Sequence, residues 1–237
     1  EDKVPGSGIL TSTFSPGATF PLRDVIHLMI TVSDNTATNM VVDQVGLAAT
    51  GELMKTLDCP ETVLHSKVYR RDTSIHPERS KKYGLGSTTA GEMVRLLEML
   101  HRDELVSTSA SKKMKAHMAA TQDSTKIRRL LPAGTRVIHK TGSVSASRTD
   151  AGIVHSPAGP FAVCVLTHNN ADRGGNDNSS GDMLCSTIAK AAYDYFNADA
   201  EEPAVDPTLK VGSTGLLVEA LQRTLNAKLE PSPSLGV

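Results

Sequence analysis

The chain has 237 residues, of which 39% are hydrophobic and 22% charged, a composition typical of globular rather than disordered proteins. Its formal net charge of −1 gives no indication of binding to nucleic acids or to anionic membranes. The longest apolar runs are far shorter than the ~20 residues that a membrane-spanning helix needs, so no transmembrane segment is expected.

The first part of the chain is predicted to be helical. A helix opens near Thr19 and Pro21: Thr19 or its neighbour is interpreted as the cap and Pro21 as a first-turn residue, and apolar side chains follow at three- and four-residue steps. The triplet SDN at 33–35 comes next, and a second helix begins within it and ends at Gly46, a residue suited to a left-handed cap. A third helix is expected over 48–57.

Residues 59–87 lack sustained periodicity and are predicted to form a long ordered loop of the kind that often carries function. Thr89 and Glu92 then fit a capping box at the start of another helix. That helix carries an apolar stripe, and a further helix begins near Ser109; the stripe consists of Met93, Leu96, Leu97 and Leu100.

After Pro132 the pattern becomes extended. Segments 135–142, 150–156 and 160–168 are predicted to be three consecutive strands of an antiparallel meander. A last helix runs to residue 196. An acidic, proline-bearing linker covers 197–208, and the one helix visible in 209–237 is too short to bury a core alone.

The three cysteines, Cys59, Cys164 and Cys185, are too few and too scattered for a disulfide framework, and no two have metal-ligand spacing. The polar segment at 169–182 has carboxylates and amides, but without the register of an EF-hand loop. We therefore expect neither a metal ion nor another cofactor.

Two short motifs are candidates for a functional site, SDN at 33–35 and HKTGS at 139–143. Each alone is weak evidence of function, because an ordinary turn or the end of a strand would explain it equally well. Their order and context are more specific, since one follows an apolar helix and the other lies in the first strand of the meander. With the stretches PGSGIL, PLRDVIHLMITVSDNTATNMVVDQVG and GSTTAGEMVRLL, they resemble the penicillin-recognising serine enzymes, particularly the class A β-lactamases.

The resemblance covers residues 4 to about 196 and implies an α/β (α+β) fold with two lobes. One lobe is an antiparallel sheet flanked by helices, including the final helix at 181–196. The other is an all-helical lobe that carries residues 20 to about 130, with the site between the two. We expect a β-lactamase-like domain over 1–196 that is incomplete at its N-terminus, the linker at 197–208, and a partial peptidoglycan-binding-like segment at 209–237.

The resemblance also implies roles for the SDN residues and for the lysine of the second motif. Ser33 would relay a proton toward the departing amide nitrogen, because a hydroxyl both donates and accepts. Lys140 would supply an adjacent positive charge and attract the substrate carboxylate. Asn35 would bond the side-chain amide of the substrate, whereas Asp34 is assigned the structural task of fixing the turn.

The residues that follow Lys140 are expected to line the substrate. The hydroxyls of Thr141 and Ser143 would bond its carboxylate, and the Ser143 N–H would form one half of an oxyanion hole. Gly142 would leave room for a substrate that lies along the strand edge. For Arg148, assistance with the carboxylate and a solvated surface position stay equally open.

The chain departs from the family pattern in its nucleophile. No S-x-x-K motif precedes Ser33, and the one at 109–112 lies downstream of both other motifs, where Ser109 is interpreted as a helix cap and Lys112 as exposed. We expect that the chain begins after the nucleophile helix. It would then lack activity alone, unless another chain or copy completes the fold.

A second departure concerns hydrolysis of the acyl-enzyme. The E-x-x-L-N stretch that supplies the deacylating base in class A enzymes is missing from the loop, and Glu78 is interpreted as a surface residue. This absence favours a D,D-peptidase-like or slowly hydrolysing relative.

Three readings follow. The leading one is a serine hydrolase acting on β-lactams or D-Ala-D-Ala-type peptides, with a β-lactam or a peptidoglycan stem peptide as its ligand. The second is a catalytically defective cell-wall-binding protein that retains the penicillin-recognition cleft, and the third is a structural α/β domain with accidental motifs. Because LKVGSTGLLVEALQRTLN resembles the start of a peptidoglycan-binding module, a periplasmic, extracellular or cell-wall location is expected for the parent protein.

Overall fold

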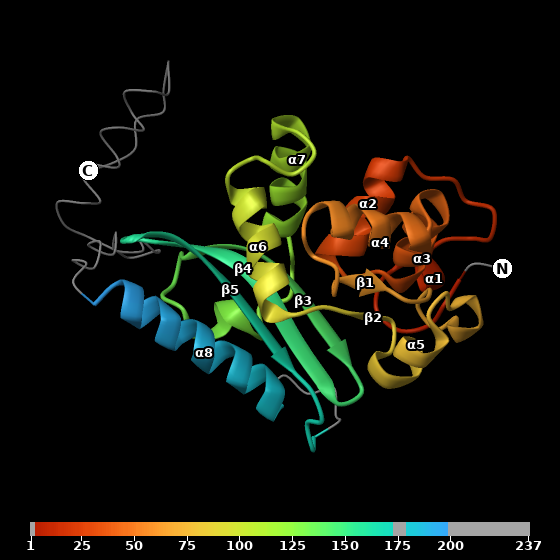
Figure 1. The fold of residues 1–237 in the computed structure, drawn as a ribbon. Helices are drawn as coiled ribbons and strands as arrows, with labels where there is room; N and C mark the ends of the chain where they lie inside the picture. Colours follow the sequence, from red (N-terminus) through yellow and green to blue (C-terminus); the bar gives the residue numbers. More distant parts are fainter. Residues whose placement is uncertain (1–2, 173–178, 199–237) are drawn as a thin grey trace, which may run out of the picture. The chain divides into compact units, whose positions relative to one another are not determined.

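A computed structural model describes residues 3–172 and 179–198. Its centre is an antiparallel sheet of order β3-β4-β5, formed by Arg136–Val144, Ser147–Ser156 and Gly159–Thr167. Helix α8 (Ser180–Phe196) packs on one face of this sheet, and helices α6 (Ala90–His101) and α7 (Thr108–Ala119) pack on the other (Figure 1). The predicted meander and final helix are thus confirmed.

Side chains that alternate along the strands contribute to a hydrophobic cluster on each face of the sheet. Val137 and Val154 join the cluster beneath α8, where Cys185 and Ala189 are fully buried. The adjacent residues Ile138 and Ile153 point to the opposite face and pack with Leu97 of α6. Because side chains alternate along a strand, the continuous apolar runs of these strands cover both faces.

A helical region carries the first motif. It comprises α1 (Leu10–Thr13), α2 (Leu22–Thr31), α3 (Asn35–Val45) and α4 (Leu47–Thr56). Its core is a cluster of buried residues from three of these helices, Leu10, Val25 and Ala37. Helices α6 and α7, which fall within the range expected for an all-helical lobe, instead cover the sheet, and α7 also contacts α2.

The segment 59–87 contains more regular structure than the loop predicted from the sequence. Strands β1 (Val63–Leu64) and β2 (Gly86–Ser87) pair antiparallel at its ends. Between them lie a 3₁₀ turn, η1 (Arg71–Thr73), and the short helix α5 (Pro77–Tyr83). Another 3₁₀ turn, η2 (Ile127–Leu130), packs against α8.

Helix ends show which local signals were correct. Gly46, with φ of 85°, ends α3 as expected. The cap of α2 is Pro21, with no side-chain cap from Thr19, and the cap of α7 is Ser107 rather than Ser109, so both of those assignments were wrong. Serine and threonine caps are interchangeable over short stretches, so the sequence alone did not separate 107 from 109.

The capping box at α6 is only half formed. The Thr89 hydroxyl accepts from the Glu92 N–H, but the Glu92 carboxylate bonds the Glu61 N–H and the Thr62 hydroxyl. The glutamate therefore ties α6 to the turn before β1. The expected linker at 197–208 and segment at 209–237 lie almost wholly outside the described residues.

Candidate active site

The two sequence motifs meet between α2 and β3. The ammonium group of Lys140, on β3, donates a hydrogen bond to the Ser33 hydroxyl just beyond α2, although 107 residues separate the two in the sequence. The same ammonium donates to the Thr141 carbonyl at 2.6 Å. The helical region and the sheet are therefore joined by a polar contact between Ser33 and Lys140, two of the residues predicted from the sequence to lie in the site.

Asp34 holds the turn that presents Ser33. Its buried carboxylate caps α3 by accepting from the Ala37 N–H at 2.9 Å. The other carboxylate oxygen accepts the N–H groups of Ile9 and Leu10 at 2.7 and 2.9 Å. Ser33 itself has a φ of 52°, an uncommon value for a residue other than glycine, so the turn is held by these bonds rather than by local preference.

The segment 5–10 packs against the SDN motif and forms hydrogen bonds with it, contacts that were not predicted from the sequence. The Asn35 amide donates to the Pro5 carbonyl at 2.9 Å, and its backbone N–H donates to the Ser7 carbonyl at 3.0 Å. Gly8 has a φ of 111°, and a Cβ atom there would lie 2.3 Å from the Asp34 carboxylate. The glycines in PGSG were the available signal, because they permit this close approach.

Burial sets the electrostatics of Lys140. Loss of solvent around the ammonium lowers its pKa, and Lys126 acts in the same direction, while the carboxylates of Asp123 and Asp150 oppose the shift. A lysine with a lowered pKa exchanges its proton more readily near neutral pH. A lysine ammonium hydrogen-bonded to a hydroxyl, as in the pair Lys140–Ser33, is an arrangement through which a proton can pass.

Thr141 and Asp123 form a second polar layer on the buried side of β3. Burial acts to raise the pKa of Asp123, but hydrogen bonds from Thr125 and Thr141 and the charge of Lys126 outweigh it and hold the pKa below its usual range. The Thr141 hydroxyl is thus engaged with a carboxylate in this structure. Its expected contact with a substrate carboxylate stays a prediction.

Gly142 and Ser143 occupy the exposed end of β3. A Cβ at Gly142 would lie 2.5 Å from the Thr149 hydroxyl on β4, so a side chain at this position would have to displace that hydroxyl. The carbonyls of His139 and Thr141 accept from side chains rather than from the β4 backbone, namely the Thr121 hydroxyl and the Lys140 ammonium. Because alternate residues of a strand face the same edge, the Ser143 backbone points outward as well.

Arg148 is not a solvated surface residue. Its side chain is buried, and one guanidinium nitrogen donates to the Ser145 and Ser147 carbonyls at 3.0 and 2.9 Å. Its Nε lies 3.9 Å from the Asp182 carboxylate. The alternative that Arg148 is a solvated surface residue was therefore wrong. Its side chain stabilises the turn between β3 and β4.

A buried pair behind Lys140 also escaped sequence reasoning. His139 is fully buried, and its Nδ1 lies 3.0 Å from the Asp150 carboxylate, which accepts the Ile127 N–H at 3.0 Å. This pair joins β3, β4 and η2 directly beneath the motif. The alternation of His139 with Lys140 on β3 was the signal, because it places the two side chains on opposite faces.

The loop contributes Tyr69 beside Asn35. The Asn39 side chain bonds both the N–H and the carbonyl of Val68, at 2.8 and 3.0 Å, and so fixes the loop against α3. Tyr69 follows with a φ of 57° and 65% of its surface exposed. A Cβ at Gly6 would meet both the Tyr69 hydroxyl and the Asn35 amide, so both groups lie against Gly6.

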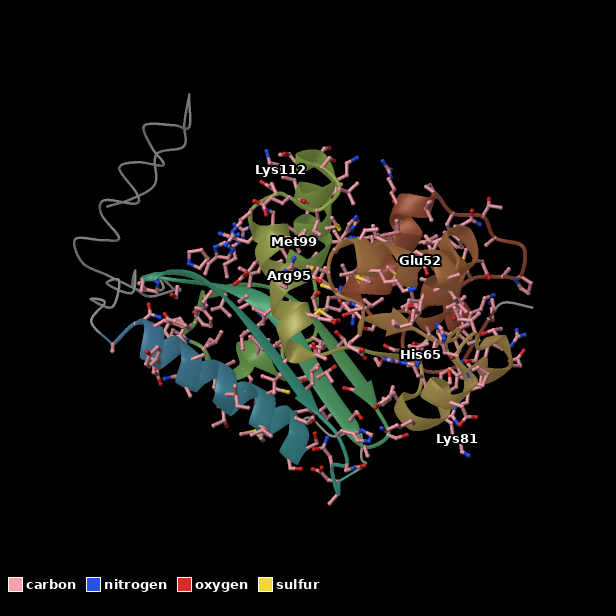
Figure 2. The ribbon with its side chains drawn as sticks, viewed as in Figure 1. Glu52, His65, Lys81, Arg95, Met99 and Lys112 are labelled. Atoms are coloured by element: carbon pink, nitrogen blue, oxygen red, sulfur yellow. The ribbon has the colours of Figure 1, made fainter. Side chains whose placement is uncertain are left out.

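The remaining candidates lie on surfaces. Glu78 is exposed in the first turn of α5, as expected. Ser109 and Lys112 are exposed on α7, and Figure 2 shows Lys112 pointing away from the sheet. The S-x-x-K at 109–112 therefore lacks the setting of a buried nucleophile, in agreement with its exclusion.

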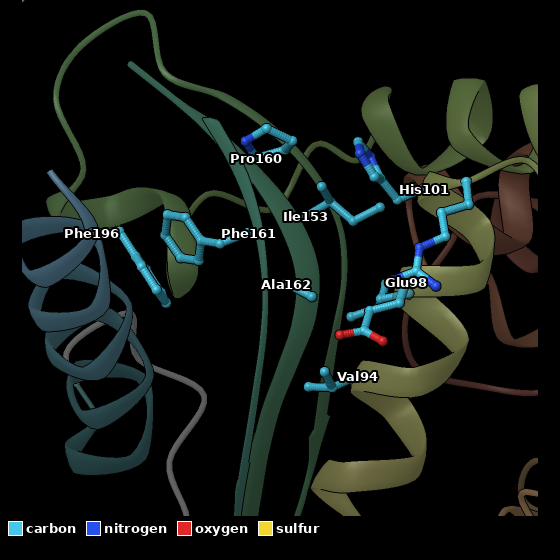
Figure 3. A pocket seen from close by; sticks show the side chains of 10 residues that line it. Val94, Glu98, His101, Ile153, Pro160, Phe161, Ala162 and Phe196 are labelled. Atoms are coloured by element: carbon cyan, nitrogen blue, oxygen red, sulfur yellow. The ribbon is translucent and has the colours of Figure 1, made fainter. Parts of the chain in front are cut away.

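A separate cavity of about 330 Å³, with a lining of mixed polarity, lies between α6, the sheet and the end of α8 (Figure 3). Glu98 and His101 stand at its rim, and Ile153, Phe161 and Phe196 line it. None of the motif residues contributes to it. Within residues 3–172 and 179–198, no cluster of three metal-binding side chains occurs and no helix is both long and apolar enough to cross a membrane.

Comparisons with known proteins agree with this arrangement. A family model described as the Beta-lactamase enzyme family matches residues 1–196. The curated extended-spectrum beta-lactamase PER-1 of Pseudomonas aeruginosa is 25% identical over 183 residues, which cover 74% of this chain and 57% of PER-1. The chain thus spans less than two thirds of that relative.

Solved structures give the same result. The beta-lactamase of Sphaerobacter thermophilus is 29% identical with a TM-score of 0.72, over 83% of this chain and 71% of that one. PBP-A, at 24% identity and a TM-score of 0.68, shares the fold over 82% of this chain and 68% of its own. A PBP-A mutant, 25% identical with a TM-score of 0.67 over the same shares, was solved as an acyl-enzyme complex with penicillin G.

Proposed function

We propose that this chain, which belongs to the beta-lactamase enzyme family, forms the substrate-recognition and proton-relay half of a serine acyl-transfer site. The substrates are β-lactams or peptides that end in D-Ala-D-Ala. The observation that carries the proposal is the hydrogen bond from Lys140 to Ser33, which joins the two motifs. We assign the chemistry to these two groups because a hydroxyl beside a buried lysine can pass a proton in either direction.

In this proposal a substrate lies along the outer edge of β3. The Ser143 N–H stabilises the oxyanion, and Lys140 attracts the substrate carboxylate with help from the Thr141 and Ser143 hydroxyls. The Asn35 amide, held at Pro5, bonds the side-chain amide of the substrate. The exposed ring of Tyr69 forms the wall beside that amide, where it can pack on an apolar acyl group.

We propose that no serine of residues 1–237 is the attacking nucleophile. This inference rests on two observations: no S-x-x-K precedes Ser33, and the serine of the one at 109–112 is exposed on α7. Deacylation is proposed to be slow, because the loop at 59–87 contains no E-x-x-L-N stretch and Glu78 is exposed on α5. Slow deacylation is the behaviour of a D,D-peptidase-like relative rather than of an efficient lactamase.

The same two observations favour a second candidate, a cell-wall-binding protein that keeps the cleft without catalysis. Both candidates place the parent protein at the cell wall, in the periplasm or outside the cell. They differ in whether a nucleophile-bearing segment restores acylation.

Intact-mass spectrometry after incubation with penicillin G separates the candidates. Residues 1–237 alone are expected to gain no adduct, whereas co-expression with a segment that carries S-x-x-K should give one penicillin adduct. Failure of the completed protein to acylate would support the binding protein. An adduct on the 237-residue chain alone would show that its own residues supply the nucleophile.

A further inference from the structure

A carboxylate that the proposed reaction does not use lies beside Thr141. Asp123 belongs to the connection between α7 and η2, and its Oδ1 accepts the Thr125 N–H at 2.9 Å and the Thr125 hydroxyl at 2.6 Å. Its Oδ2 lies 3.4 Å from the Lys126 ammonium. The Thr141 hydroxyl is a further hydrogen-bond donor to this carboxylate. The chain's own carboxylate thus bonds the hydroxyl that is expected to bind the carboxylate of a substrate.

The Thr141 hydroxyl has a single proton to donate, and Asp123 takes it. Burial acts to raise the pKa of the Asp123 carboxyl, but the bonds from Thr125 and Thr141 and the charge of Lys126 outweigh it and hold the pKa below its usual range. The ionised carboxylate is an acceptor only, so Thr141 is the donor in their hydrogen bond. A substrate carboxylate is also an acceptor, and it can receive this proton only by displacing Asp123.

The charges of the polar layer are already matched. Burial lowers the pKa of the Lys140 ammonium, and the charge of Asp123 opposes that shift, so the two groups interact. Among the described residues, the layer brings together three cations and three carboxylates, which are Lys126, Lys140 and Arg148, and Asp123, Asp150 and Asp182. Apart from His139, which bonds Asp150, these charges cancel. A further carboxylate would give the layer an excess of negative charge.

An amide group meets these conditions, whereas a carboxylate does not. Its N–H can donate to the Asp123 carboxylate, its carbonyl can accept from the Lys140 ammonium, and it adds no charge. We propose that Asp123 is a specificity-determining residue, which directs the site toward peptides that carry an amide, rather than a free carboxylate, at this position. This inference rests on the proposed function and refines it. The preferred peptides either continue beyond this position or end there in an amide.

Asp123 is accessible to a ligand and can be altered with little change of shape. Its side chain retains 34% of its surface, whereas Thr141 is buried. Asn at position 123 has nearly the same shape without the charge, and its oxygen can still accept the Thr125 N–H. Asp123→Asn is therefore the informative variant. Glu78→Gln, which removes one charge from the exposed face of α5, is the matched control.

The test is an NMR titration of isotope-labelled residues 1–237 at pH 7 with N-acetyl-D-Ala-D-Ala and with its C-terminal amide. The wild type should bind the amide about tenfold more tightly, because the free acid places a like charge beside Asp123. Asp123→Asn should bind the acid about tenfold more tightly than the wild type does and should lose the preference for the amide. Glu78→Gln should behave as the wild type.

The outcomes separate this inference from the proposed function. Equal affinities of the wild type for acid and amide would overturn the inference alone, and this comparison needs no variant that might fail to fold. Binding of neither peptide to either protein would count against the proposed function, and the amide preference would fail with it. Acetate, which carries the carboxylate without a peptide, should shift the Thr141 amide resonance in Asp123→Asn but not in the wild type. Equal shifts in both proteins would show that Asp123 does not exclude carboxylates.

Discussion

At the scale of single residues, the molecule depends on a lysine whose charge is largely buried. Lys140 bonds Ser33 and the Thr141 carbonyl, yet burial lowers its pKa. The motif indicated that a charged group was present, but its surroundings come from Ser33 beyond α2 and from the charges of Asp123, Asp150 and Lys126. No local pattern reports these contacts, so the altered pKa was beyond sequence reasoning.

The lowered pKa predicts a stability difference at alkaline pH. Between the folded pKa of Lys140 and the unfolded value of about 10.4, the unfolded chain binds more protons, so the free energy of unfolding rises with pH. The penalty for burying the charge is present below the folded pKa and is relieved above it. Urea unfolding should be measured for the wild type and for Lys140→Met from roughly pH 7 to 10. As the pH rises, the free energy of unfolding of the wild type should increase relative to that of the variant. If the free energies of unfolding of the two proteins change with pH in parallel, the lowered pKa of Lys140 is contradicted.

Tyr69 carries a prediction about the acyl group of the substrate. The ring is exposed beside Asn35 and Gly6, on a backbone with positive φ. In saturation-transfer NMR, Tyr69→Ala should reduce the signal of the penicillin G phenyl ring relative to that of the thiazolidine methyls. Tyr69→Phe should retain it, and Tyr83→Ala, which removes another exposed aromatic ring of the same loop, should have no effect. An equal loss of both signals in Tyr69→Ala would rule out the stacking role.

At the scale of elements, α3 depends on a carboxylate that also reaches a distant segment. Asp34 caps α3 and accepts the N–H groups of Ile9 and Leu10. Removing it leaves three backbone donors unpaired, two of them buried, so Asp34→Ala should lower the free energy of unfolding by about 3 kcal/mol. Asp24→Ala, at an exposed ion pair with Arg23, should change it by less than about 0.5 kcal/mol. Urea unfolding measures both, and equal effects would refute the role given to Asp34.

Helices and strands could be predicted where the pattern lay within the element itself. The predictions were wrong where an element depends on contacts with residues distant in the sequence. The meander followed from alternation and turns, and Gly46 ended α3 as predicted. Glu92 looked like a local cap but bonds Glu61 and Thr62, and the loop at 59–87 acquires its short strands only because β1 and β2 pair across 22 residues or more. Such pairings depend on the fold rather than on neighbours in sequence.

At the scale of the whole molecule, the site exists because α2 and β3 come together. The motifs alone did not establish this meeting, which the sequence analysis took from a family resemblance; the structure supplies the contact itself. For the supports of the site, the sequence held only local signals, the glycines of PGSG and the alternation of His139 with Lys140, and neither identified the bonding partner. These supports are long-range contacts that only the assembled chain provides.

The central claim is that Lys140 and Ser33 form a β-lactam-recognition site, and reversible binding tests it most directly. Saturation-transfer NMR with penicillin G should detect binding to residues 1–237 and to Lys112→Ala, whose lysine is exposed on α7. Lys140→Ala should weaken binding by roughly tenfold or more, as expected from loss of a charged hydrogen bond of about 1.5–3 kcal/mol. A folded Lys140→Ala chain that binds penicillin G as tightly as the wild type would contradict the account.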